Sequence, residues 1–163
     1  MMGDKSDALL DAFQRAIVSR SRAAFTELCA VDVHYEDPFS GGPVRGIGPL
    51  VDHIAQLWAA APDAVAETSG TRLDGGKFLC APIRLAGTHS GDAGGLPATG
   101  KKFDTQVLLY CELDADRQRL WRVRAFVDSY DLAVQLGVLP NRGGAADKAL
   151  MVLRGFGLRV RRD

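Results

Sequence analysis

The sequence predicts an α+β fold in which helices come first and a curved antiparallel sheet follows. Apolar residues recur every three or four positions up to residue 61, which is the period of a helix. From residue 64 onward they recur at every second position, which is the period of a strand. Helices and strands separated in this way favour helices packed on one face of an antiparallel sheet. We expect the curved sheet and its covering helices to enclose a pocket.

One folded domain accounts for most of the chain. Its 163 residues, 47% of them hydrophobic, suffice to bury roughly two thirds of the unfolded surface. The 20 basic residues equal the 20 acidic ones, so no overall field draws the chain to nucleic acid, and no such partner is predicted. We assign residues 1–140 to the domain and residues 141–163 to a linker and a short basic apolar tail.

Three amphipathic helices are predicted before residue 62. Ser6 is placed to cap the first, Ser21 begins the second, and the third runs from Gly46 to Ala61 and ends at Pro62. The second helix is expected to end before the turn-rich stretch of residues 32–46. The apolar face of the first helix contains Leu9, Leu10, Phe13, Ala16 and Ile17. That of the second contains Ala24, Phe25, Leu28 and Cys29, and that of the third contains Ile47, Leu50, Val51, Ile54, Leu57 and Trp58.

Four strands are predicted after the helices. The first covers residues 64–73, and a turn at 74–76 leads into the second at residues 77–89. The third and fourth cover residues 102–113 and 119–128 and are joined by a charged turn. We expect an apolar patch on the outer face of the sheet, and therefore a homodimer, from Trp121, Val123 and Val127.

His89 is the first candidate for chemistry. Strand alternation places it on the same face as Leu79, Ala81, Ile83 and Leu85, which is the apolar face. A neutral imidazole there donates from one nitrogen and accepts at the other, which suits a substrate carbonyl. The alternative is that His89 only satisfies a backbone carbonyl at the strand end.

Two carboxylates are candidate acid–base groups. Asp128 ends the last predicted strand, where a base could remove a proton next to a carbonyl. The alternatives for Asp128 are that it caps the following turn or pairs with Arg124. Asp37 precedes Pro38, which holds it in an extended conformation, and its alternative use is to form an Asx-type turn.

Several other kinds of site lack their sequence signatures. Nucleophile elbows, Walker loops, His-Glu-x-x-His and paired Cys-x-x-Cys motifs are absent, so we expect no metal and no cofactor. Cys29, Cys80 and Cys111 are widely spaced in apolar stretches and are expected to be reduced thiols of a cytoplasmic protein. The amino end is read as a helix rather than an export signal, and no apolar run approaches the roughly 20 residues of a membrane span.

Three stretches in order resemble one known family. They are "THSG" at residues 88–91, "PATGKKF" at 97–103 and "DSYDLAVQLGVLP" at 128–140. From about Ser6 to Pro140 the chain resembles the SnoaL-like polyketide cyclases, which share a cone-shaped α+β barrel with nuclear transport factor 2 and ketosteroid isomerase. This resemblance implies a cone-shaped fold and ring closure by intramolecular aldol condensation without a cofactor. It also implies that Asp128, which precedes the Gln-Leu-Gly ending, is the acid–base group.

The stretch "YEDPFSGGPVRG" at residues 35–46 resembles the segment of ketosteroid isomerase that carries its general base. Asp37 matches the base itself. Phe13 and Leu109 fall where that isomerase has its two oxyanion donors, and both are apolar. The sequence therefore does not predict that oxyanion hole.

The leading hypothesis is a SnoaL-like cyclase or isomerase that acts on an apolar polyketide- or steroid-like carbonyl compound. Asp128, His89 and Asp37 are its candidate catalytic residues. The alternative is a non-catalytic module that binds a small ligand or a partner on the same fold, and a hydrolase of the epoxide-opening type is a third class. The tail is expected to pack on its own domain or across a dimer more readily than on a membrane. The candidate substrate-binding residues are Phe13, Tyr35, Trp58, Tyr110 and Arg124.

Overall fold

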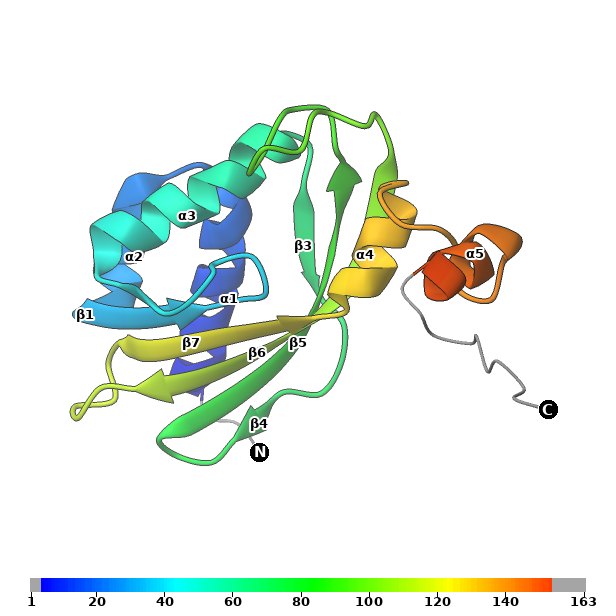
Figure 1. The fold of residues 1–163 in the computed structure, drawn as a ribbon. Coiled ribbons are helices and arrows are strands. Elements are labelled where there is room, and N and C mark those ends of the chain that lie inside the picture. The colour runs from blue at the N-terminus through cyan, green and yellow to red at the C-terminus, as the bar shows by residue number, and fades with distance from the viewer. Residues whose placement is uncertain (1–3, 154–163) are drawn as a thin grey trace.

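The computed structural model describes residues 4–153 and confirms the α+β fold (Figure 1). The helices α1, α2 and α3 lie together on one side of the sheet, and α4 and α5 lie at its far end. The helices are α1 (Asp4–Ser19), α2 (Arg22–Leu28), α3 (Ile47–Ala60), α4 (Ser129–Gln135) and α5 (Ala145–Leu153). The strands are β1 (Cys29–Glu36), β2 (Val44–Arg45), β3 (Val65–Thr68), β4 (Leu73–Asp74), β5 (Phe78–Thr88), β6 (Lys102–Leu113) and β7 (Leu120–Val127).

The seven-stranded sheet has the order β2-β1-β7-β6-β5-β3, with β4 paired to β5. The predicted strands pair antiparallel, as expected, and the parallel pair of the sheet is that of β7 with the additional strand β1. Strand β1 itself was not predicted, since the stretch from residue 32 was expected to be turn-rich and Cys29 was assigned to a helix. In β1 the buried Val33 and Tyr35 alternate with the more exposed Asp32 and His34, as in a half-buried strand.

The other predicted elements differ from the observed ones mainly at their ends. The predicted strand of residues 64–73 is two short strands, β3 and β4, both paired with β5. The predicted turn at residues 74–76 joins β4 to β5, and β5, β6 and β7 form an antiparallel meander. The α1 and α3 helices agree with the apolar periodicity because each is long enough to repeat the pattern several times.

The core lies between the helices and the inner face of the sheet. The ring of Phe13 in α1 meets that of Phe25 in α2 edge to face, with centroids 5.9 Å apart, and both side chains are fully buried. Full burial of one such side chain contributes roughly 1.5–3 kcal/mol. The space next to α1 and α2 is thus filled by side chains. The sheet supplies to this core, among others, Leu79, Ala81, Ile83, Val107, Leu109, Cys111, Leu120 and Val123.

The outer face of the sheet carries an apolar patch made of other residues than expected. Val123 is fully buried and Val127 packs against the core, so neither forms an outer patch. Instead Pro82, Leu108 and Phe126 stand opposite one another across β5, β6 and β7. Leu108 is 43% exposed and Phe126 is 55% exposed. In β5, β6 and β7 the exposed apolar residues therefore occupy the positions that alternate with the buried core residues.

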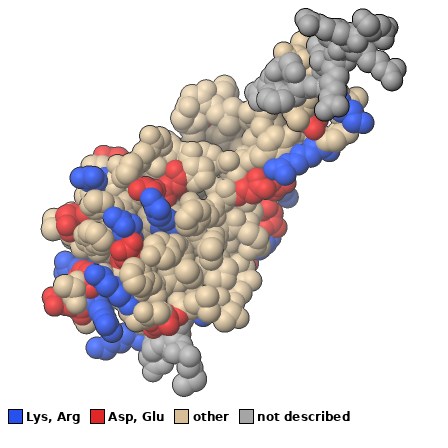
Figure 2. Space-filling model, turned by 60° about the horizontal axis from the view of Figure 1, so that its bottom comes forward, with Lys and Arg blue, Asp and Glu red and all other residues tan. Residues whose placement is uncertain are grey.

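Charged side chains of both signs are interspersed on the face of the molecule shown in Figure 2, beside a broad uncharged area. This mixture agrees with the zero formal net charge of the chain. Within the described residues no helix is long and apolar enough to cross a membrane.

The segment after residue 140 contains the helix α5, whose described side chains are not buried. Tyr130 of α4 holds the start of this segment, since its hydroxyl group donates to Asp147 and Arg142 stacks on its ring. The basic apolar tail expected around Arg154, Phe156, Leu158, Arg159, Arg161 and Arg162 lies outside the described residues.

Arg72 connects α1 to strand β3 through ion pairs and a hydrogen bond. Its guanidinium forms ion pairs with Asp7 at 3.2 Å and Asp11 at 2.6 Å, and it donates to Thr68 Oγ1 at 2.9 Å. Only 9% of the Arg72 side chain is exposed, whereas both carboxylates are nearly half exposed. A cation buried among these partners is stabilised by bonds that water cannot replace without opening the contact.

We therefore expect Arg72→Met to lower the free energy of unfolding by about 1–3 kcal/mol, because several charge-assisted hydrogen bonds are lost at a buried position. Urea unfolding measures this loss. Arg84→Met is the matched control, since Arg84 forms its ion pairs with Glu67 and Asp104 in solvent and such pairs contribute about 0–1 kcal/mol. An equal effect of the two substitutions would contradict the role given to Arg72.

Candidate active site

Asp37 lies in a tight turn just after β1. Its Oδ1 accepts a hydrogen bond of 2.8 Å from the backbone amide of Phe39, and the Ser40 hydroxyl donates to its backbone carbonyl at 2.9 Å. The Asx-type turn that the sequence allowed is therefore present. This turn uses one carboxylate oxygen and leaves Oδ2 for a second function.

The second oxygen of Asp37 connects a strand to a helix. Its Oδ2 accepts a hydrogen bond of 3.0 Å from the hydroxyl group of Tyr35 in β1 and lies 2.7 Å from Nε2 of His53 in α3. The side chains of Asp37 and His53 are each 12% exposed, and Tyr35 is buried. The rings of Tyr35 and His53 are also in contact, with centroids 5.6 Å apart. A carboxylate, a phenol and an imidazole thus form one nearly buried cluster.

The charges in this cluster follow from its hydrogen bonds. Burial alone would raise the pKa of Asp37, but the bonds from His53, the Phe39 amide and Tyr35 outweigh it and lower the pKa below its usual value. Burial, and then the neighbouring Asp37 charge, raise the pKa of Tyr35 well above its usual value. Asp37 is therefore an ionised acceptor, and Tyr35 is a neutral donor. Since an ionised carboxylate only accepts, Nε2 of His53 carries a proton and donates it to Oδ2.

His53 was not predicted as a site residue. It lies in α3 directly before Ile54, next to the apolar stripe that packs against β1. A polar ring beside the buried face of a helix needs a hydrogen-bond partner. The position of His53 beside the apolar stripe was therefore the one signal in the sequence that could have marked it as a site residue. The sequence could not identify Asp37 as that partner, because β1 was not predicted.

His89 is buried on the inner face of the sheet at the end of β5, as expected. Its Nδ1 accepts a 3.2 Å hydrogen bond from the backbone amide of Thr99 and lies 3.1 Å from Thr99 Oγ1. We assign the ring proton to Nε2, because Nδ1 accepts from an amide. The alternative considered from the sequence was a hydrogen bond from His89 to a backbone carbonyl. The observed bond is instead one that His89 accepts from a backbone amide.

The crossing of residues 90–101 packs against the end of α3. The amides of Ser90 and Gly91 both donate to the carbonyl of Ala60 at 3.0 Å. A Cβ atom at Gly91 would lie 2.0 Å from the carbonyl oxygen of Ala59, so only glycine fits there. His89 is consequently held between the crossing and the sheet.

Asp128 is the N-cap residue of α4. Its Oδ1 accepts from the amide of Asp131 at 2.9 Å and lies 3.6 Å from Arg142. The Asp128 side chain is 59% exposed. Arg124 pairs with Glu36 at 2.7 Å. The observed contacts are those of the capping alternative, and none of them joins Asp128 to His89 or Asp37.

The remaining predicted binding residues lie on two sides of the sheet. Phe13 is in the core, and Trp58 donates from its indole nitrogen to the carbonyl of Ile17 at 2.7 Å. Tyr110 stacks on Phe78 at 6.2 Å and stands opposite Arg124 on the outer face. Tyr110 and Arg124 therefore cannot line a pocket under the helices.

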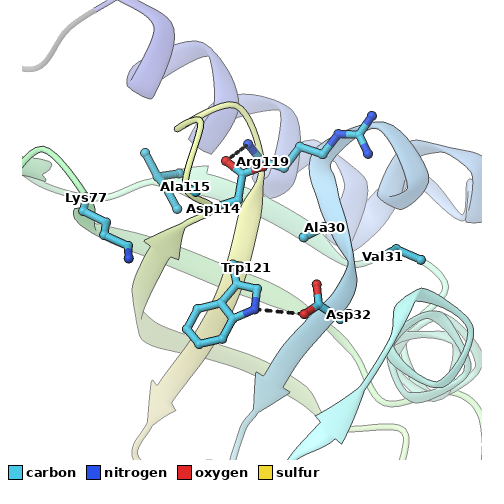
Figure 3. A pocket seen from close by; sticks show the side chains of 9 residues that line it. Ala30, Val31, Asp32, Lys77, Asp114, Ala115, Arg119 and Trp121 are labelled. Carbon is cyan, nitrogen blue, oxygen red and sulfur yellow. Dashed lines mark hydrogen bonds between the residues drawn. The ribbon is translucent and has the colours of Figure 1, made fainter.

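The surface of residues 4–153 also carries two open hollows. The one in Figure 3 has a volume of about 440 Å³ and lies at the start of β1, where the indole of Trp121 donates to Asp32 at 3.3 Å. The other has a volume of about 340 Å³ and lies beside α4, between Arg84 and Gln135. Neither is lined by a predicted catalytic residue. Within residues 4–153 no three His, Cys, Asp or Glu side chains are grouped as metal ligands would be.

The lowered pKa of Asp37 predicts a dependence of stability on pH. The stabilisation is complete above the unfolded-state pKa of about 3.9 and is lost as the pH falls through the lower folded-state value. Asp37→Asn should therefore lower the free energy of unfolding at pH 7 by about 1–3 kcal/mol, and the difference should shrink toward pH 3.

Urea unfolding between pH 3 and pH 7 checks this expectation. Asp116→Asn is the control, because Asp116 lies in the exposed turn between β6 and β7 and its change should stay within about 0.5 kcal/mol. A difference between the native chain and Asp37→Asn that stays constant with pH would contradict the assignment.

Comparison with known proteins agrees with this architecture. The family model described as SnoaL-like polyketide cyclase matches residues 7–136. TsrD from Streptomyces laurentii is 17% identical and has a TM-score of 0.74, with 85% of this chain and 99% of that chain covered. A SnoaL-like protein from Jannaschia sp. CCS1 is 16% identical with a TM-score of 0.72, over 86% and 99% of the two chains.

A third solved structure, IdmH from Streptomyces antibioticus, is 23% identical and has a TM-score of 0.69, with 83% of this chain and all of that chain covered. At these identities the structures show the fold alone. No curated protein sequence matches. Because the family model covers most of the domain, the chain belongs to the SnoaL-like polyketide cyclase family, with the fold of ketosteroid isomerase.

Proposed function

We propose that this protein is a cofactor-free acid–base enzyme that acts on an apolar polyketide- or steroid-like carbonyl compound. The observation that carries the proposal is the nearly buried cluster of Asp37, Tyr35 and His53. Clusters of titratable groups with shifted pKa values are typical of catalytic sites. The family and the relatives named as candidate polyketide cyclases and isomerases support the same class of reaction.

The chemistry begins with removal of a proton next to a carbonyl group. The resulting enolate either attacks a second carbonyl carbon and closes a ring, or takes up a proton elsewhere and is isomerised. His89 is proposed to donate from Nε2 to the enolate oxygen, since its Nδ1 is already held by Thr99. Asp128 has no such part in this proposal, because its carboxylate caps α4 in solvent.

The second candidate function is a module that binds an apolar ligand without chemistry. The filled interior around Phe13 favours it, since that part of the domain leaves little space for a substrate. The two candidates differ in one measurable property, which is exchange of a substrate proton with solvent.

The exchange of the acidic C–H of a 1,3-dicarbonyl compound with deuterium oxide, followed by NMR, tests the proposal. The native chain should exchange this proton faster than buffer, and Asp37→Asn should slow it by roughly 10²–10⁴-fold, the usual contribution of acid–base catalysis. Asp128→Asn is the matched carboxylate control and should remain within about threefold, because its position is exposed. Equal exchange by the native chain and Asp37→Asn would contradict the proposal, and binding without exchange would favour the ligand-binding module.

The proposed assembly is a homodimer formed through the outer face of the sheet. Pro82, Leu108 and Phe126 form its apolar centre. The charges beside them are neutralised within the chain, since Arg84 pairs with Asp104 and Arg124 pairs with Glu36. Two identical faces of this kind can meet without like-charge repulsion.

We expect Phe126→Asp to convert the dimer to a monomer, because a carboxylate would be buried without a partner at the interface. Analytical ultracentrifugation should give twice the chain mass of 17.5 kDa for the native protein and the single mass for the variant. Val31→Asp, at an exposed position on β1, should remain dimeric. A monomeric native chain, or a dimeric Phe126→Asp variant, would contradict this interface.

The proposed location is the cytoplasm. Cys29 and Cys111 are buried, Cys80 is partly buried, and all three are free thiols. Burial raises the pKa of Cys29 to about 12 and raises that of Cys111 further, so neither forms the reactive thiolate readily. Free thiols of this kind are typical of a reducing compartment.

A further inference from the structure

His53 uses only one of its two ring nitrogens. Its Nε2 bonds to Asp37, and its Nδ1 has no hydrogen-bond partner among residues 4–153. In that part of the chain, Arg72 Nε is the one side-chain nitrogen or oxygen that is both fully buried and unpaired. The Nδ1 atom of His53 is therefore not sealed from solvent, although only 12% of the side chain is exposed.

Asp37, in contrast, has three of its roughly four acceptor positions already bonded. The Phe39 amide occupies Oδ1, and Tyr35 and His53 both bond to Oδ2. These bonds stabilise the ionised form, which makes the carboxylate a weaker base. A carboxylate held in this way is better suited to orient a neighbouring imidazole than to remove a proton.

Resting on the proposed function, we propose that Nδ1 of His53 is the base that removes the substrate proton, with Asp37 as its positioning residue. The substrate C–H bond breaks, its proton forms a bond to Nδ1, and its electron pair remains on the substrate as the enolate. Asp37 fixes the proton of the neutral ring on Nε2 and stabilises the imidazolium that forms, as the carboxylate does in a catalytic triad. The proton on Nδ1 then returns to the alkoxide or carbanion of the product.

Tyr35 supports this arrangement from the other side of the carboxylate. Its hydroxyl group donates to the same Oδ2 that bonds to His53, so it holds the Asp37 side chain at a fixed angle. The ring of Tyr35 also packs beside that of His53. Tyr35 is thus a second positioning residue, which acts through Asp37.

The deuterium-exchange assay with the same 1,3-dicarbonyl compound tests the inference through two variants of His53. His53→Gln keeps an amide that can donate to Asp37 and so preserves the fold, but it has no basic nitrogen. His53→Ala leaves space for a free imidazole. We expect both variants to lose roughly 10²–10⁴-fold in exchange rate. Imidazole added to the buffer should restore a large part of the rate to His53→Ala.

Imidazole should not restore the rate to Asp37→Asn, since that variant retains its own His53 ring but cannot orient it. This rescue is the readout that a merely structural effect would not produce, and urea unfolding of each variant shows whether its fold is intact. If folded His53→Gln exchanges at the native rate while Asp37→Asn does not, Asp37 is the base, and the inference is overturned while the proposed function stands. If folded His53→Ala is not rescued, the inference is also overturned. If the native chain itself shows no exchange, the proposed function fails, and this inference fails with it.

Discussion

The hydrogen bond between Asp37 and His53 is the contact on which the account of this protein depends. It joins the turn after β1 to the middle of α3, across a distance of 2.7 Å and in a nearly buried position. Polar groups removed from water destabilise a fold unless they bond to one another. Asp37, Tyr35 and His53 satisfy this condition together, so each group fixes the ionisation and orientation of the others.

The unusual strand β1 brings this cluster together. It lies parallel to β7, with Tyr35 opposite Val123 and Glu36 opposite Arg124. The ion pair between Glu36 and Arg124 secures the end of β1 next to Asp37. The chain then reverses toward β2 through Gly41, whose φ of 66° favours glycine. These backbone constraints place Asp37 against α3 independently of any substrate.

The sequence was sufficient to predict the parts of the fold that are long and strongly periodic. Helix α3 and the meander of β5, β6 and β7 repeat their patterns many times, so short irregularities do not obscure them. Apart from Cys29 at its start, strand β1 has only Val33 and Tyr35 as buried residues. It then runs into a stretch rich in proline and glycine, which conceals its alternation. The cluster could not be predicted without β1, because His53 meets Asp37 only when that strand is paired with β7.

The sequence also could not predict the orientation of the Asp128 side chain. Its position in the sequence matches the resemblance, but as the N-cap of α4 its carboxylate accepts from the amide of Asp131 and faces solvent.

The most direct test of the central claim is NMR of the protein labelled with ¹⁵N in histidine, at a pH where the His53 ring is neutral. We predict one tautomer, with the proton on Nε2 and a free lone pair on Nδ1. A proton on Nδ1, or rapid averaging of the two tautomers as in a solvent-exposed histidine, would contradict it.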